Sequence, residues 1–188
     1  LSYDKFHKKW QQIYRVNSDI TIQGKIDKGP STQEPFGPAL VKDFPEVLYQ
    51  CRIIDRNTKF LVNYKEKNFY EDKIIFADST FFKIFSFPLL KGNAETALSK
   101  PNSIVISQES AEKYFDKEDP IGKILKIDND KSWEVTGVME KISGNSHLKF
   151  DFAFSRPPSS FSGWFSFGLT TYILLPKNYE AIDLEKKL

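Results

Sequence analysis

Apolar side chains change their spacing within the first thirty residues of the chain. An interval of three or four separates Tyr3, Phe6, Trp10 and Ile13, and this is the repeat of a helix with one apolar face. Between Val16 and Ile26 the apolar residues keep even-numbered positions against polar neighbours, which is typical of a half-buried strand. The sequence therefore predicts an amphipathic helix that is followed by a strand.

The next segments alternate between turn formers and apolar runs. Residues 27–35 have the composition of a loop, and a helix is predicted from Pro38, which suits a first helical position, to Phe44, where Pro45 ends it. Strands are then expected at 47–54, 59–64 and 69–76. Asp78 is placed to cap a short helix that is rich in phenylalanine.

A second set of elements follows Gly92. A strand at 103–106 leads into a helix that Ser107 caps and that runs to Phe115. Strands at 123–127 and 133–138 are expected to form a hairpin with Asn129-Asp130 at its tip. Further on, we expect a strand at 148–154, a linker at 156–163, a buried strand at 170–175 and the start of a helix at Asp183. The last elements return to the type of the first, which predicts an α+β fold with an inserted, strand-rich lobe.

Composition excludes several classes of protein. The 188 residues include 27 basic and 25 acidic side chains, a net charge of +2, and the lysines are spread along the chain, so nucleic acid is not an expected partner. The single cysteine, Cys51, excludes an intrachain disulfide and a cysteine-rich zinc site. No apolar run approaches the roughly 20 residues of a spanning helix. Without an initiator methionine or a signal-peptide pattern, the chain is expected to be a piece of a longer protein.

Candidate chemistry is sparse. A metal site would need carboxylates beside His7 and His147, and Asp4 with His7 supplies only two ligands on one helical face. Ser146, His147 and Asp151 are the residue types of a nucleophilic triad. However, adjacent Ser and His side chains do not readily face each other, and a G-x-S-x-G elbow is absent from the sequence. A turn in which His147 binds backbone explains these residues better.

Two ion- and nucleotide-binding motifs also fail on inspection. Asp128, Asp130 and Ser132 resemble the start of a calcium loop, but Trp133 and Met139 occupy the positions that need glycine and an acidic ligand. A phosphate-binding loop is excluded because Lys117 stands where its first glycine would be. We therefore predict no catalytic residue, no cofactor and no metal in this chain.

The segment FADSTFFKIFSFPLLKG at 76–92 resembles the central signature of the MacB-like periplasmic core domain, which belongs to ABC transporter permeases of the FtsX-like family. Further segments match in the same order, namely SYDKFH at 2–7, IYRV at 13–16, GPAL at 37–40, FPEV at 44–47, PNSIVIS at 101–107, AEKYF at 111–115, EDPIGK at 118–123, VTGV at 135–138 and NSHLKFD at 145–151. One departure is Asp116, where relatives usually carry glycine.

This resemblance implies a two-lobed domain between the first and second transmembrane helices of a permease in the inner membrane, on the periplasmic side. A mixed α/β Porter lobe would comprise 1–86 and 162–188, and an inserted β-rich Sabre lobe would comprise 87–161. ATP would be hydrolysed by a separate cytoplasmic ATPase domain or subunit. The resemblance also implies a dimer in the full complex and partners such as a periplasmic adaptor and lipoprotein or peptide cargo.

Two functions are compatible with such a domain. It would transmit ATP-driven motion to the export or efflux of cargo, or it would act as an FtsX-like scaffold that docks and activates a cell-wall hydrolase. Force transmission would pass through a stalk that includes Phe6, Trp10 and Tyr14, which could equally be ordinary core residues. Phe161, Trp164 and Phe165 beside the linker would contact a partner, or pack between the lobes.

Overall fold

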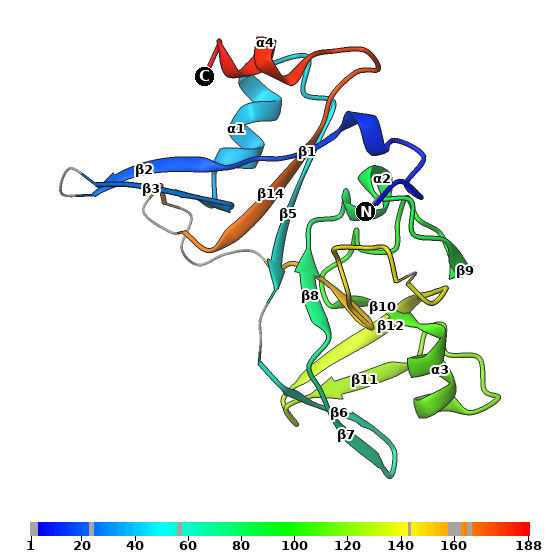
Figure 1. Ribbon diagram of the computed structural model, residues 1–188. Coiled ribbons are helices and arrows are strands. Elements are labelled where there is room, and N and C mark those ends of the chain that lie inside the picture. Colours follow the sequence, from blue (N-terminus) through cyan, green and yellow to red (C-terminus); the bar gives the residue numbers. More distant parts are fainter. Residues whose placement is uncertain (1–3, 23–24, 56–57, 143, 158–162, 165–166) are drawn as a thin grey trace. The chain divides into compact units, whose positions relative to one another are not determined.

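The computed structural model of the chain describes residues 4–22, 25–55, 58–142, 144–157, 163–164 and 167–188 (Figure 1). The chain divides into two compact units. Unit 1 comprises Leu1–Lys8 and Asp55–Pro157, and unit 2 comprises Lys9–Ile54 and Pro158–Leu188. These boundaries separate the chain into two units that are each compact. The assignment of 1–86 with 162–188 to a Porter lobe and of 87–161 to a Sabre lobe stays a prediction.

Unit 2 is built on a small antiparallel sheet. Its central strand is β14 (Leu169–Leu174), which pairs with β1 (Ile13–Arg15), with β5 (Tyr49–Asp55) and with the short β4 (Ser31–Thr32). A separate hairpin consists of β2 (Ser18–Ile22) and β3 (Lys25–Gly29). The buried strand that was predicted at 170–175 is therefore confirmed as the centre of this sheet.

Two helices complete the core of unit 2. Helix α1 (Phe36–Asp43) begins two residues before Pro38, and Pro38 still lies among the first helical positions, where a missing N–H group loses no helical hydrogen bond. Helix α4 (Ala181–Glu185) lies near the end of the chain. The buried residues of this cluster are Leu40, Val47, Ile173, Leu175 and Leu184.

Unit 1 contains a larger mixed sheet with the strand order β8-β13-β10-β12-β11-β6-β7. In that order its strands are Ile74–Ala77, Phe152–Ser155, Ser103–Ser107, Lys131–Met139, Ile124–Ile127, Phe60–Tyr64 and Lys67–Glu71. The pairs β8·β13 and β10·β12 are parallel, and β9 (Leu89–Gly92) adds an antiparallel partner to β12. This mixture of strands with few helices confirms the α+β class.

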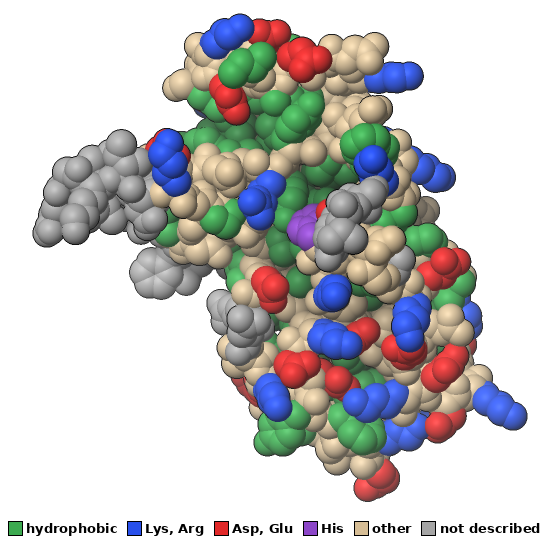
Figure 2. Space-filling view, viewed as in Figure 1, with side chains coloured by type: hydrophobic (Ala, Val, Ile, Leu, Met, Phe, Trp, Pro, Cys, Tyr) green, Lys and Arg blue, Asp and Glu red, His purple; other side chains and the backbone are tan. Residues whose placement is uncertain are grey.

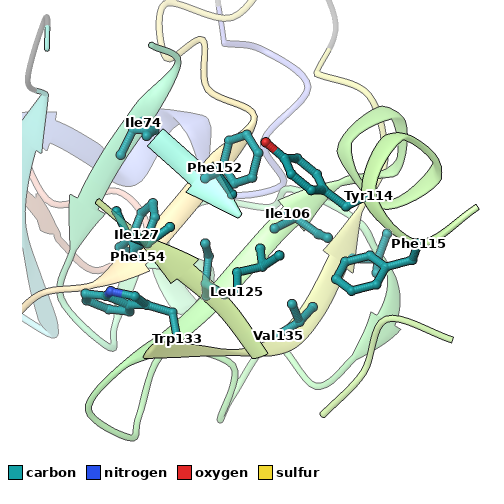
Figure 3. Close-up of a cluster of buried hydrophobic side chains, with 13 residues drawn as sticks. Ile74, Ile106, Tyr114, Phe115, Leu125, Ile127, Trp133, Val135, Phe152 and Phe154 are labelled. Carbon is teal, nitrogen blue, oxygen red and sulfur yellow. The ribbon is translucent and has the colours of Figure 1, made fainter. Parts of the chain in front are cut away.

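The main core of unit 1 forms where α3 (Gln108–Phe115) packs against this sheet (Figure 3). Tyr114 and Phe115 come from the helix, and they meet strand residues such as Phe152 and Val135. Nearly all of the side chains in this cluster are removed from water. Because each buried large apolar side chain contributes about 1.5–3 kcal/mol, the cluster is the main source of stability for the sheet.

Helix α3 confirms the prediction from its capping signal. The Ser107 hydroxyl accepts a hydrogen bond from the Ser110 N–H at 3.2 Å, which satisfies one donor of the first turn. The helix ends at Phe115, as predicted. The hairpin between β11 and β12 is also confirmed, with Asp128 and Asn129 in the left-handed region at its tip.

The N-terminal helix is a wrong prediction. The described residues before Ile13 form turns and a single 3₁₀ turn, η1 (Trp10–Gln12), and Tyr3 lies outside the described part of the chain. Asp4 has a φ of 62°, which no right-handed helix contains. Its backbone N–H donates to the Asn145 carbonyl, so contacts with a distant segment override the helical spacing.

Four smaller predictions are corrected as well. The strand expected between Val16 and Ile26 is the β2–β3 hairpin, and the one expected at 69–76 is divided between β7 and β8. The strand expected at 148–154 begins only at Phe152. Thr80, not Asp78, occupies the N-cap position of α2 (Phe81–Ile84), and the Asp78 carboxylate accepts a hydrogen bond from Arg156 Nε.

Replacing Asp116 with glycine is expected to stabilise the chain by about 1 kcal/mol. Asp116 follows α3 with φ 52° and ψ −107°, a region that costs a residue with a side chain far more than it costs glycine. The salt bridge to Lys67 that the change removes is exposed and contributes little. Urea unfolding measures the difference. Lys117→Gly, one position later and without a positive φ, is the control and should not stabilise.

Candidate functional site

The three residues predicted to form a stalk do not share one element. Phe6 belongs to unit 1, where its ring lies 5.7 Å from that of Phe87. Trp10 lies on η1 and Tyr14 on β1, both in unit 2. Phe6 and Trp10 are exposed, whereas Tyr14 packs against the buried cluster of unit 2. The structure therefore separates them into a residue on one unit and two on the other.

Residues 4–8, which we call the N-terminal strap, are held in unit 1 by Asp4. The Asp4 carboxylate accepts a hydrogen bond from the His147 backbone N–H at 3.1 Å, and its other oxygen lies 2.6 Å from His147 Nδ1. The Asp4 N–H donates to the Asn145 carbonyl at 2.9 Å. Three contacts thus tie one residue of the strap to the segment before β13.

His7 anchors the other end of the strap. Its side chain is only 2% exposed, and its Nδ1 atom accepts a hydrogen bond from the Ser86 N–H at 3.0 Å. The rings of Phe85 and Phe87 meet the imidazole edge-on. Burial lowers the His7 pKa to about 4, although Asp4 opposes this effect. His7 is therefore neutral at pH 7, and its buried imidazole packs between aromatic rings and accepts one backbone hydrogen bond.

Unfolding measurements between pH 7 and pH 4 should detect His7. The unfolded histidine, with a pKa of 6.5, binds a proton through this range more readily than the folded one, with a pKa of about 4. Stability is therefore lost as the pH falls from 6.5 towards 4, by at most about 3 kcal/mol. His7→Asn keeps an acceptor near Nδ1 but cannot titrate, so its stability should fall less over this range. Equal losses in both proteins would contradict the assignment.

The C-terminal segment is held by unit 2. Leu184 of α4 is buried in the core of unit 2. The Glu46 carboxylate accepts a hydrogen bond from the Tyr179 hydroxyl at 3.0 Å and forms an ion pair with Lys187 at 2.5 Å. The first described residues of the chain and its last residues are therefore fastened to different units.

Of the three aromatic residues predicted to contact a partner, only Trp164 lies within the described part of the chain. Its side chain is 52% exposed, and its ring meets that of Phe36 edge-on at 6.5 Å. Phe161 and Phe165 lie outside the described residues. Of these three side chains, the structure therefore describes one exposed indole, which packs on one side against Phe36 of α1.

The residue types of a nucleophilic triad are present, but they are not assembled. His147 pairs with Asp4, while Asp151 forms an ion pair with Lys73 at 3.3 Å. The Ser146 hydroxyl is buried and makes no hydrogen bond to a described residue. Sequence reasoning missed the Asp4–His147 pair because its members are 143 positions apart and no local pattern links them.

Other shifted pKa values reflect ordinary packing. Hydrogen bonds from Lys65 and Lys123 lower the pKa of Glu118 to about 2. Burial raises the pKa of Tyr114, whose hydroxyl donates to the Glu71 carboxylate at 2.7 Å. Acidic and basic side chains are intermixed on the face shown in Figure 2.

Metal-binding clusters and membrane-spanning helices were also sought. Within the described ranges, His, Cys, Asp and Glu side chains do not come together in groups of three or more that could hold a metal ion. None of the helices in the same ranges has the length and apolar character needed to cross a membrane.

Three solved structures share this fold. A domain from Porphyromonas gingivalis, of a protein assigned as a permease, superposes with a TM-score of 0.81 at 21% identity and covers 97% of this chain and 80% of its own. The periplasmic region of MacB from Actinobacillus actinomycetemcomitans gives 0.62 at 12% identity, with coverage of 84% and 71%. The extracellular domain of the noncanonic ABC-type transporter YknZ from Gram-positive bacteria gives 0.58 at 18%, with coverage of 93% and 86%.

The sequence identities to these structures are too low to assign a family, and comparison with family models assigns one. A search among curated proteins found no match. The model of the MacB-like periplasmic core domain matches residues 2–184, which is nearly the whole chain and includes every segment that carried the resemblance. The chain therefore belongs to the family of MacB-like periplasmic core domains, the periplasmic domains of ABC transporter permeases.

Proposed function

We propose that this domain transmits ATP-driven motion from the membrane part of an ABC transporter permease to the export of cargo. Family membership supports a cytoplasmic ATPase as the source of the motion. The observation that carries the proposal is the attachment of the two ends, since the N-terminal strap packs in unit 1 and the C-terminal segment packs in unit 2.

This attachment has a mechanical consequence. A transmembrane helix that precedes residue 1 pulls on unit 1 through Asp4 and His7. One that follows residue 188 pulls on unit 2 through α4. Because the ends are anchored separately, a displacement between the two helices acts on the units differently, which is a requirement for rigid-body rearrangement.

The candidate residues take distinct roles in this proposal. Phe6 transmits force into unit 1, beside His7 and Phe87, while Trp10 and Tyr14 receive it in unit 2. Exposed Trp164, together with Phe161 and Phe165, is the proposed contact for a periplasmic partner, either an adaptor or the cargo itself. Large exposed aromatic side chains are frequent anchors of such interfaces.

Cysteine labelling of the full-length permease in intact cells tests the location. Lys126 is exposed on β11, so Lys126→Cys in a Cys51→Ala background should react with a membrane-impermeant maleimide that passes the outer membrane. The Cys51→Ala permease without Lys126→Cys is the control, and it reports labelling at any cysteine outside this domain. Labelling of Lys126→Cys only after lysis would contradict a periplasmic domain.

The gene and its surroundings test the transport role. We expect the encoded sequence to contain a transmembrane helix before Leu1 and another after Leu188, and their absence would contradict the permease assignment. Neighbouring genes for an ATPase, an adaptor and an outer-membrane channel are expected for export. A neighbouring cell-wall hydrolase gene would instead favour a scaffold that activates that enzyme.

A further inference from the structure

A pocket of about 270 Å³ lies in unit 1. Three regions that are distant in sequence form it, namely the segment before β8, the first turn of α3, and the connection between β12 and β13. The residues that carry the argument are Lys73, Glu109, Lys141, Lys149, Phe150 and Asp151. None of them is used in the proposed function.

Two ion pairs already neutralise part of the charge in the pocket. Lys73 Nζ lies 3.3 Å from the Asp151 carboxylate, and Lys141 Nζ lies 2.6 Å from the Glu109 carboxylate. Each pair joins the connection between β12 and β13 to one of the other two regions. Together the two pairs balance two lysines with two carboxylates.

The remaining charged group in the pocket lining is Lys149. Among the described residues its ammonium forms no ion pair, and its side chain is exposed at the lining of the pocket. Three lysines against two carboxylates leave one surplus positive charge.

One wall of the pocket excludes water. Phe150 is 2% exposed, and its ring packs edge-on against those of Phe81 and Phe87. Lys149 precedes Phe150 in the chain and is exposed where Phe150 is buried, so the surplus charge lies on the solvent side of this wall.

We propose that this pocket binds a small oxyanion, a carboxylate or a phosphate group, through Lys149 with support from Lys73 and Lys141. Its volume is slightly below the usual range of about 300–1,000 Å³ for small-molecule sites. The pocket therefore suits a free anion or the charged end group of a larger molecule. A bound anion would form an ion pair with Lys149. It would also be attracted by Lys73 and Lys141, which line the pocket and are already paired with Asp151 and Glu109.

Amide NMR of the 188-residue chain at pH 7 tests the site. Sodium acetate and sodium phosphate are titrated separately, with sodium chloride holding the ionic strength constant. The Gly144 and Asp151 amides should shift and saturate, with a dissociation constant on the order of 10 mM. Saturation by acetate alone identifies a carboxylate site, by phosphate alone a phosphate site, and by both a general oxyanion site.

Variants separate this site from general attraction to a basic surface. Lys149→Glu should weaken binding at least about fivefold, and Lys149→Gln is the milder change if the reversal disturbs folding. Lys126→Glu, an equal charge change on β11, should leave binding unchanged. Glu109→Gln releases Lys141 and should tighten binding about two- to fivefold. Shifts that never saturate, or equal binding by Lys149→Glu and Lys126→Glu, would overturn the proposal without affecting the proposed transport function.

Discussion

Phe81→Ala is expected to lower the free energy of unfolding of unit 1 by about 3–5 kcal/mol. Phe81 is fully buried, and its ring contacts a group of aromatic side chains, namely Phe82, Phe85, Phe87 and Phe150. Truncation removes the buried ring and leaves a cavity that these large side chains cannot readily fill. Phe85 and Phe87 also pack on His7, so the same change should loosen the strap.

Urea unfolding, followed by amide signals from unit 1, measures this loss, and hydrogen exchange at Ser86 reports the strap separately. Tyr70→Ala is a matched control because Tyr70 is a large aromatic residue with most of its side chain in water. It should cost less than about 0.5 kcal/mol. A loss below 1 kcal/mol for Phe81→Ala would show that the phenylalanine cluster does not support unit 1.

Asp78→Ala is expected to cost about 3–5 kcal/mol for an electrostatic reason. Arg156 Nε donates to an Asp78 carboxylate oxygen at 2.7 Å, and the two side chains are only 9% and 11% exposed. They follow β13 and β8, which are parallel neighbours, so the pair joins the carboxyl ends of two strands. Removing the carboxylate leaves a buried guanidinium group without this counter-charge.

A double variant and an exposed pair provide the controls. Asp78→Ala combined with Arg156→Met removes both charges and should recover most of the lost stability. Asp183→Ala breaks an exposed pair with Lys186 and should change stability by less than about 0.5 kcal/mol. If Asp78→Ala costs no more than Asp183→Ala, the Arg156 pair is not a stabilising element of unit 1.

Elements with local signals could be predicted from the sequence. Helix α3 has a capping serine at Ser107 and ends at Phe115, and β14 is a short apolar run, so neighbouring residues decide both. The strap failed because its conformation depends on contacts with Asn145 and His147, far along the chain. The helical spacing of apolar residues contains no information about backbone conformation that is set by contacts with residues far along the chain.

The candidate site shows the same limit. Family resemblance located the domain, but the helical spacing of apolar residues placed Phe6 and Trp10 on one helix, whereas they belong to different units. The lysine pocket had no signal in the sequence, because its residues come from three regions that are distant along the chain. Surplus charge at Lys149 becomes visible only when the partners of Lys73 and Lys141 are known.

The most direct test of the account measures the distance between the two units during the ATPase cycle. Spin labels at Lys42→Cys on α1 of unit 2 and Lys126→Cys on β11 of unit 1 both occupy exposed positions. They are introduced into the full-length permease with its ATPase, in a Cys51→Ala background, and measured by pulsed electron paramagnetic resonance. Addition of ATP is predicted to shift the distance distribution, and His7→Ala, which loosens the strap, should reduce that shift. Identical distributions with and without ATP in a complex that hydrolyses ATP would contradict motion transmission through this domain.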